Sequence, residues 1–194
     1  MNFNSQNLSK DLSWKLPSWL ENELAAYENH IFTSDKEKMD FVLMLTAKNI
    51  KNKTGGPFGA ACFCMKTHTL ISVGVNQVAL LHNPCLHAET TALQLACKKA
   101  SSFSLKNFSE VELFSSCEPC MMCFGACLWS GIKRLVTSAT AQDAKDLGFD
   151  EGPVGSASWD HLKQKGVEIK KSFLRQKGRD LLKIYQKDGL IYNA

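Results

Sequence analysis

The alternation of short apolar strands with amphipathic helices is the feature that most constrains the fold of this 194-residue chain. Ser34-Asp35 caps a helix whose apolar residues recur at helical spacing until about Thr54-Gly55-Gly56. Strands are expected at 58–65, 69–76, 110–116, 133–139 and 167–173, and further helices at 86–100, 120–129, 141–148, 159–166 and 175–189. This order predicts a three-layer α/β/α sandwich on a five-stranded mixed sheet.

Residues 1–33 are interpreted as an N-terminal extension of a single domain that covers residues 34–194. Pro17 would open a short helix whose apolar stripe, which includes Trp19 and Leu20, lies on the main body. No apolar stretch is as long as a membrane span, and the N-terminus has no apolar signal segment. We therefore expect a cytoplasmic protein without membrane contact, in which the eight cysteines serve metal binding or catalysis rather than disulfides.

Four of these cysteines lie in the segment SCEPCMMCFGAC (Ser116–Cys127). Their spacing, C-x2-C-x2-C-x3-C, is the one that bacterial ferredoxins use to hold an iron–sulfur cluster. In those proteins a proline usually follows the fourth cysteine, whereas Leu128 follows it here. The segment also has the composition of a continuous helix rather than of an irregular loop around a cluster. Both tests argue against the iron–sulfur interpretation.

A helix that begins after Pro119 would place Cys120 and Cys123, three residues apart, on one face of its first turn. His87 stands at the start of another predicted helix about thirty residues earlier. One imidazole and two thiolates are three zinc ligands, and they leave the fourth tetrahedral position open for water, as in catalytic sites. Cys117 is close enough to compete as a ligand, although the register of the helix favours the other two cysteines.

The pair of motifs H-x-E (His87-Ala88-Glu89) and P-C-x-x-C (Pro119–Cys123) is the signature of the zinc deaminases. With GGPFGA (Gly55–Ala60) and GVN (Gly74–Asn76), they make the chain from Gly55 to Pro153 resemble the cytidine deaminase superfamily, and within it the purine branch, which includes the guanine deaminases and the bacterial tRNA adenosine deaminases. The resemblance implies that residues 34–194 form a zinc-dependent deaminase domain. Zn²⁺ would activate a water molecule, and Glu89 would carry protons as general acid and base.

The segment AQDAKDLGFDE (Ala141–Glu151) resembles the guanine deaminase branch, and W-x-x-L-x-x-x-G-V (Trp159–Val167) and GLIYN (Gly189–Asn193) resemble its bacterial guanine and ammeline deaminases. The resemblance implies guanine as the substrate, with xanthine and ammonia as products. In guanine deaminases an acidic residue at the position of Glu151 is expected to shuttle a second proton to the leaving amine. The alternative is that Asp150-Glu151 is only a solvated turn. Two other activities stay open for the same site: deamination of adenosine in tRNA, and deamination of guanosine or ammeline.

Family position also implies a set of residues that bind the base. Asn76 would bond its carbonyl edge, Phe58 would stack on its ring, and Trp129 would shape the pocket floor unless it is ordinary core. The closing segment LIYNA, which contains Tyr192, would be a lid over the active site. In this family such a segment can cross to the partner subunit, so a homodimer with exchanged C-terminal segments is expected; a frayed tail is the alternative.

The charge pattern favours a small-molecule partner, a purine or a triazine, over a nucleic acid. The formal net charge is only +4, and the basic residues between Lys163 and Lys187 are interleaved with acidic ones. No aromatic residues alternate with them to stack on bases. A catalytically silent scaffold with structural zinc is a third possibility, but such a site has no need of the carboxylate of Glu89.

Overall fold

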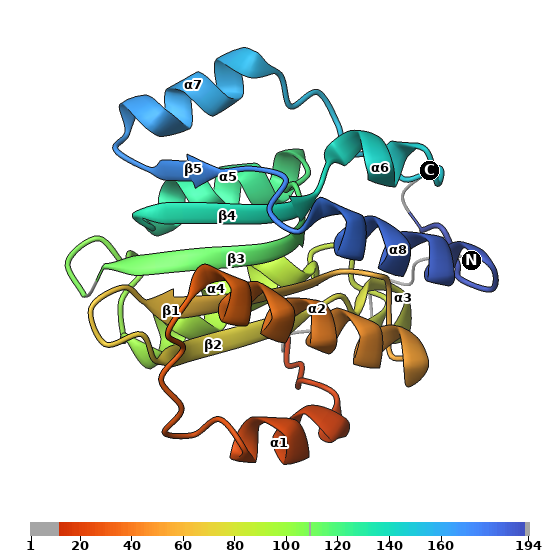
Figure 1. Ribbon diagram of the computed structural model, residues 1–194, viewed down its shortest axis with the longest axis horizontal. Helices are drawn as coiled ribbons and strands as arrows, with labels where there is room; N and C mark the ends of the chain where they lie inside the picture. The colour runs from red at the N-terminus through yellow and green to blue at the C-terminus, as the bar shows by residue number, and fades with distance from the viewer. Residues whose placement is uncertain (1–11, 109, 193–194) are drawn as a thin grey trace, which may run out of the picture.

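The computed structural model describes residues 12–108 and 110–192, and Figure 1 shows one mixed sheet between two layers of helices. The strand order is β2-β1-β3-β4-β5. The five strands are β1 (Gly59–Cys64), β2 (Leu70–Val75), β3 (Val111–Cys117), β4 (Arg134–Ala139) and β5 (Glu168–Lys170). Strand β1 is antiparallel to β2 and to β3, whereas β3, β4 and β5 run parallel. The predicted three-layer fold on a five-stranded mixed sheet is confirmed.

Helices cover both faces of the sheet, with α2 and α8 in front of it in Figure 1 and α4 and α5 behind it. The helices are α1 (Ser18–Ala25), α2 (Asp35–Lys51), α3 (Val78–Leu81), α4 (Ala88–Lys99), α5 (Met121–Ser130), α6 (Ala141–Lys145), α7 (Ser156–Gln164) and α8 (Arg175–Gln186). The alternation along β1 explains the two cores, because Ala60 and Cys62 pack toward α4 and α5 while Ala61 and Phe63 pack toward α2.

The described part of the N-terminal extension packs on the front layer. Leu20 of α1 and Phe32 are fully buried in the same core as α2. Residues 1–11 of the predicted extension lie outside the described residues. Among the described helices, none is both long and apolar enough to pass through a lipid bilayer.

One predicted loop contains a helix instead. Val78–Leu81 forms the single turn α3, which ends at His82 in the left-handed conformation (φ 49°). A single turn has no periodic apolar pattern, so sequence periodicity could not have found it.

Candidate metal centre and active site

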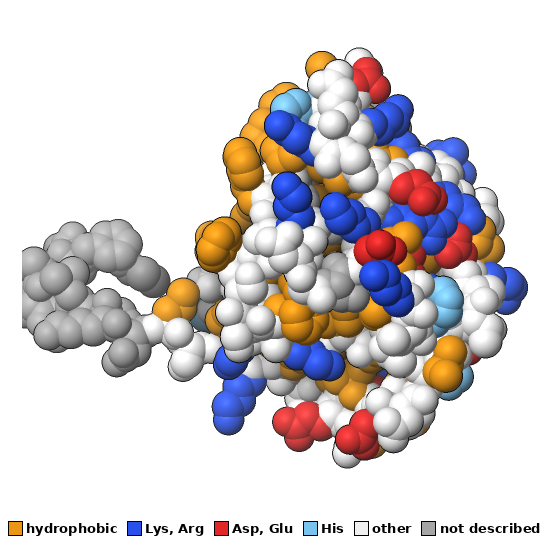
Figure 2. All heavy atoms as spheres, turned by 90° about the vertical axis from the view of Figure 1, so that its left-hand side faces the viewer, with side chains coloured by type: hydrophobic (Ala, Val, Ile, Leu, Met, Phe, Trp, Pro, Cys, Tyr) orange, Lys and Arg blue, Asp and Glu red, His pale blue; other side chains and the backbone are white. Residues whose placement is uncertain are grey.

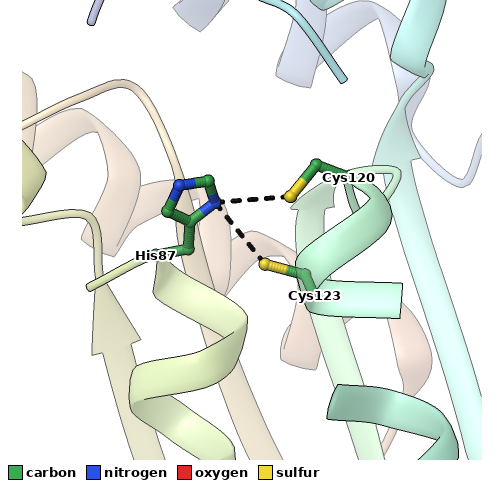
Figure 3. Close-up of side chains that lie close together, drawn as sticks. All are labelled: His87, Cys120 and Cys123. Carbon is green, nitrogen blue, oxygen red and sulfur yellow. Dashed lines mark hydrogen bonds between the residues drawn. The ribbon is translucent and has the colours of Figure 1, made fainter. Parts of the chain in front are cut away.

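The three predicted metal ligands come together at the starts of two helices. His87 is the N-cap of α4, Cys120 is the N-cap of α5, and Cys123 lies in the first turn of α5. Nδ1 of His87 lies 3.5 Å from the sulfur of Cys120 and 3.5 Å from that of Cys123, as Figure 3 shows. All three donor atoms lie within 4.8 Å of one another, so the group could hold a metal ion.

The chemistry of these donors suits a dication. A hydrogen bond from Cys123 and one with His87 lower the pKa of Cys120 to about 4, so Cys120 is a thiolate at neutral pH. The hydrogen bond between Cys123 and Cys120, together with burial, holds the pKa of Cys123 well above its ordinary value. The positive ends of α4 and α5 also face this group. One thiolate, one thiol that a cation would deprotonate and one imidazole therefore form a donor set that fits zinc.

The remaining cysteines of the motif lie elsewhere. The thiol of Cys117 donates a hydrogen bond to the backbone oxygen of Thr140 at 3.4 Å, and Cys117 packs with Phe149 in a separate apolar cluster. Cys127 is fully buried in the core behind the sheet. Because neither sulfur belongs to the donor group, Cys117 does not compete for the metal in this arrangement.

Glu89 lies in the first turn of α4, two residues after His87, and its side chain is buried, with 5% of the residue exposed. Its carboxylate accepts a hydrogen bond from the hydroxyl of Ser115 at 3.0 Å, and its other oxygen lies 3.4 Å from the sulfur of Cys123. Burial raises the pKa of Glu89, and the nearby Cys120 thiolate raises it further. Ser115 thus holds Glu89 beside the donor group.

Ser115 is a site residue that the sequence analysis missed. On β3 it follows the buried Val111 and Leu113 on the face that packs against α4. A hydroxyl at a position where this alternation calls for an apolar side chain is the signal that could have found it. Glu118 was also missed: its carboxylate accepts from the backbone nitrogen of Ala141 at 3.0 Å and ties α6 to the metal-binding segment.

Glu151 belongs to the same site and is not part of a solvated turn. Only 5% of its surface is exposed, whereas the neighbouring Asp150 is exposed. Its backbone oxygen accepts a hydrogen bond from Met121 at 3.0 Å, and Gly152 turns the chain away with φ +67°. Burial, then the charges of Cys120 and Glu89, raise the pKa of Glu151 to about 8.

These groups surround one cavity, which is nearly filled by their side chains and measures only about 10 Å³ in this structure. Its lining residues are Phe58, His87, Glu89, Glu118, Cys120, Glu151 and Tyr192. Two catalytic candidates, two of the three metal ligands, one predicted stacking residue and the lid residue therefore meet at one place. They come from segments that are spread over 135 positions of the sequence.

Asn76 is fully buried and does not itself line this cavity, but its Oδ1 and the hydroxyl of the lining residue Tyr192 both lie close to Gly56. Its Oδ1 accepts hydrogen bonds from the backbone nitrogens of Gly56 at 3.2 Å and of Val78 at 3.3 Å. These bonds fix the orientation of the amide, and its Nδ2 has no partner among the described residues. A buried donor without a partner is costly, which is typical of a group that meets a ligand.

Tyr192 covers the site of its own chain. Its ring centroid lies 6.3 Å from that of His87 and 5.3 Å from that of Phe149. Phe149 in turn contacts Phe58, with the ring centroids 5.1 Å apart. The last two residues of the predicted lid, Asn193 and Ala194, lie outside the described residues.

Trp129 is not part of this cavity. It is 77% exposed and lines a separate surface hollow together with Phe103. The helix turns by about 100° per residue, so Trp129, two positions after the buried Cys127, points to nearly the opposite side of α5. The predicted role of Trp129 as a pocket floor is therefore corrected for the single chain.

Residues 33–139, more than half of the chain, match the family model described as "Cytidine and deoxycytidylate deaminase zinc-binding region". The chain belongs to this deaminase family. It is 34% identical to the guanine deaminase of Nitrosomonas europaea, whose structure superposes with a TM-score of 0.86 over 93% of this chain and 99% of that one. It is also 37% identical to the guanine deaminase of Bacillus subtilis over 107 residues, 55% of this chain but only 65%, less than two thirds, of the Bacillus chain.

A tRNA-specific adenosine deaminase of Buchnera aphidicola is 31% identical over 119 residues, 61% of this chain and 74% of that protein. The solved structure of a tRNA:A34 deaminase is only 18% identical with a TM-score of 0.59, so that likeness concerns the fold alone. Within the deaminase family, the relatives place the chain in the guanine deaminase branch.

Proposed function

We propose that this protein is a zinc-dependent aminohydrolase that converts guanine and water into xanthine and ammonia. The observation that carries the proposal is a second buried carboxylate, Glu151, on the same small cavity as Glu89 and the His87–Cys120–Cys123 group. Replacing an amino group on a ring carbon needs protons at two places, on a ring nitrogen and on the departing amine. Two carboxyl groups in one buried cavity can serve both places.

His87, Cys120 and Cys123 would hold the zinc ion, which supplies a water molecule that is acidic enough to attack at neutral pH. Glu89 takes the proton of the attacking water and passes it to a ring nitrogen of the base. Glu151, with its raised pKa, holds a proton that it can donate to the amine as the carbon–nitrogen bond breaks. Ser115 keeps one carboxylate oxygen of Glu89 in place at 3.0 Å during these transfers.

The groups around the cavity would recognise the base. The free Nδ2 of Asn76 would donate to the carbonyl oxygen of guanine, and Phe58 offers an aromatic face for its ring. Tyr192 would close over the bound base and exclude water. We propose these as the substrate-binding residues, and Trp129 is left out because its side chain is exposed.

The closure of the site favours a free base over a nucleic acid. The cavity measures only about 10 Å³ and Tyr192 lines it, so side chains around it must move even to admit a single base. Lys and Arg side chains are interspersed with Asp and Glu on the face drawn in Figure 2 and form no single basic patch there. That face is the left-hand side of Figure 1, whereas β3 and β4 end toward the right, so it does not bear on the site; the tRNA, guanosine and ammeline alternatives must be separated from guanine by assay.

The assembly and the location are part of the same proposal. We propose a homodimer in the cytoplasm, with the domain boundary near residue 33. The C-terminal segment packs over the site of its own chain, so a complete site does not require that two subunits exchange it.

The test is ammonia release by the zinc-loaded protein from guanine, guanosine, ammeline and an adenosine-containing RNA stem-loop. We expect guanine to be the best substrate. Glu89→Gln should keep its zinc and lose about 10²- to 10⁴-fold in kcat. Removal of zinc with a chelator should abolish the activity, and added zinc should restore it. Near-normal turnover by Glu89→Gln, or activity on the RNA alone, would overturn the proposal.

A further inference from the structure

The N-terminal segment reaches the base-binding region through a chain of hydrogen bonds. The indole N–H of Trp19 in α1 donates to the hydroxyl of Thr54 at 3.0 Å. The same hydroxyl donates to Oδ1 of Asn49 at 2.7 Å. Asn49 is fully buried near the end of α2, so this chain runs from a half-buried tryptophan into the interior.

The bond from Thr54 fixes which way the amide of Asn49 points. With its oxygen bound to Thr54, its Nδ2 donates to the backbone oxygens of Gly56 and Asn76, each at 2.9 Å. Gly56 completes the set, because its backbone nitrogen donates to Oδ1 of Asn76 at 3.2 Å. Asn49 therefore holds the backbone of Asn76, and Gly56 holds its side chain.

The turn between Asn49 and Gly56 needs such support. Lys53 adopts the left-handed conformation with φ +54°, which costs a residue other than glycine about 1 kcal/mol or more. A Cβ atom on Gly55 would lie 1.7 Å from the backbone oxygen of Asn76. At that closeness, a small movement of the turn must move Asn76 as well.

Two further contacts attach the N-terminal segment to either side of this turn. The side chain of Gln77, next to Asn76, donates to the backbone oxygen of Lys15 at 3.1 Å. Glu23 forms an ion pair with Lys48, one residue before Asn49. The segment from Lys15 to Glu23 thus contacts the region around Asn49 and Asn76 at three points, and Leu20 is buried between these contacts.

We propose that Trp19 is a positioning residue through which the N-terminal segment sets the affinity of the site for its base. This inference rests on the proposed function insofar as Asn76 is taken to bind the base. Without the Trp19 bond, only the bond to Asn49 orients the hydroxyl of Thr54, so the partner that orients the amide of Asn49 is itself less firmly held. The donor of Asn76 becomes less well placed, while Glu89, Glu151 and the three metal ligands stay where they are.

The test compares Trp19→Phe, which keeps the ring but removes the N–H donor, with Trp14→Phe as the matched control. Trp14 lies in the same segment, and no partner for its indole N–H is found among the described residues. Trp19→Phe should raise the KM for guanine and the Kd for xanthine by about 3- to 10-fold, with kcat within about 2-fold of the wild type. Trp14→Phe should change neither constant.

Thr54→Val removes the hydroxyl with little change in shape and should have the same effect as Trp19→Phe. Because both substitutions break the same series of hydrogen bonds, the KM of the double variant should be no higher than that of Thr54→Val alone. Additive effects, or a fall in kcat at unchanged KM, would overturn the proposal.

Hydrogen–deuterium exchange separates this inference from the proposed function, because it needs no substrate. Exchange in the peptide that spans Thr54–Phe58 should be faster in Trp19→Phe than in the wild type and unchanged in Trp14→Phe. Unchanged exchange in Trp19→Phe refutes the positioning role, whatever the substrate. If the wild type neither binds nor deaminates guanine, the proposed function is refuted. The exchange comparison between Trp19→Phe and the wild type still tests the positioning role in that case.

Discussion

Asn76→Asp is the sharpest test of how the base is recognised. Aspartate keeps the oxygen that accepts from Gly56 and Val78 at 3.2 and 3.3 Å, so the local backbone stays supported. It replaces the free Nδ2 donor with a second carboxyl oxygen, which brings a negative charge when the group is ionised. The carbonyl oxygen of guanine then faces an acceptor instead of a donor in a fully buried position.

A buried polar group that loses its partner costs about 1–3 kcal/mol, which corresponds to about a 5- to 150-fold loss in kcat/KM for guanine. 2,6-Diaminopurine carries an amine where guanine has its carbonyl, and the new acceptor can accept a hydrogen bond from that amine. Its binding should therefore be weakened far less than that of guanine, or strengthened. The ratio of the two affinities should shift by at least about 10-fold toward 2,6-diaminopurine.

The assay is ammonia release from guanine, with 2,6-diaminopurine as a competitive ligand. Zinc content and thermal melting show whether the variant is folded and loaded. Asn76→Ala is the control, since it removes the donor and the acceptor together and should weaken both ligands. If Asn76→Asp weakens both ligands equally, or leaves guanine turnover within about 3-fold of the wild type, Asn76 does not read the carbonyl edge.

Further predictions concern the proton carriers and the stability of the fold. Glu151→Gln should lower kcat about 10²-fold or more with a smaller change in KM, whereas Asp150→Asn, on the same loop, should be nearly neutral; equal effects would contradict a catalytic role for Glu151. Ser115→Ala should lower kcat about 3- to 10-fold at unchanged zinc content, and Ser115→Thr should restore it; failure of this rescue would argue against orientation of Glu89 by the hydroxyl. Hydrogen bonds from Arg134 hold the pKa of Asp35 well below its ordinary value of 3.8, so this ion pair stabilises the fold above about pH 4 and is lost as the pH falls through the lowered pKa. Asp35→Asn should therefore lower the free energy of unfolding by about 1–2 kcal/mol at pH 7, and urea denaturation near pH 2 should find the difference reduced; a constant difference would contradict the linkage.

The metal ligands could be predicted from sequence because their geometry is local. Cys120 and Cys123 share one helical turn, and His87 lies at the start of a helix that the sequence pattern predicts. Glu89 follows from its spacing to His87. In each case, a few consecutive residues determine where the side chain points.

Residues whose role depends on contacts across the fold were harder to predict. Ser115 and Asn49 act through hydrogen-bond partners 26 and 27 positions away, and the residues next to them in the sequence do not indicate which partners those are. Trp129 was misplaced for the opposite reason: a family position was carried over, but the rotation of α5 after Cys127 turns its side chain outward. The burial of Glu151 likewise depends on contacts outside its own segment. Met121 of α5 donates to its backbone oxygen, and Gly152 turns the chain directly after it.

Both ends of the described chain act on one glycine of the site. The N-terminal segment holds the backbone oxygen of Gly56 through Asn49, and the C-terminal Tyr192 packs against its Cα from the other side. A Cβ atom at this position would lie 2.7 Å from the hydroxyl oxygen of Tyr192 and 3.0 Å from Oδ1 of Asn76. Any larger residue must therefore displace either the residue that covers the cavity or the residue that reads the base. The requirement for glycine in GGPFGA arises here from close approach, because two segments that are distant in sequence share the space that a side chain would fill.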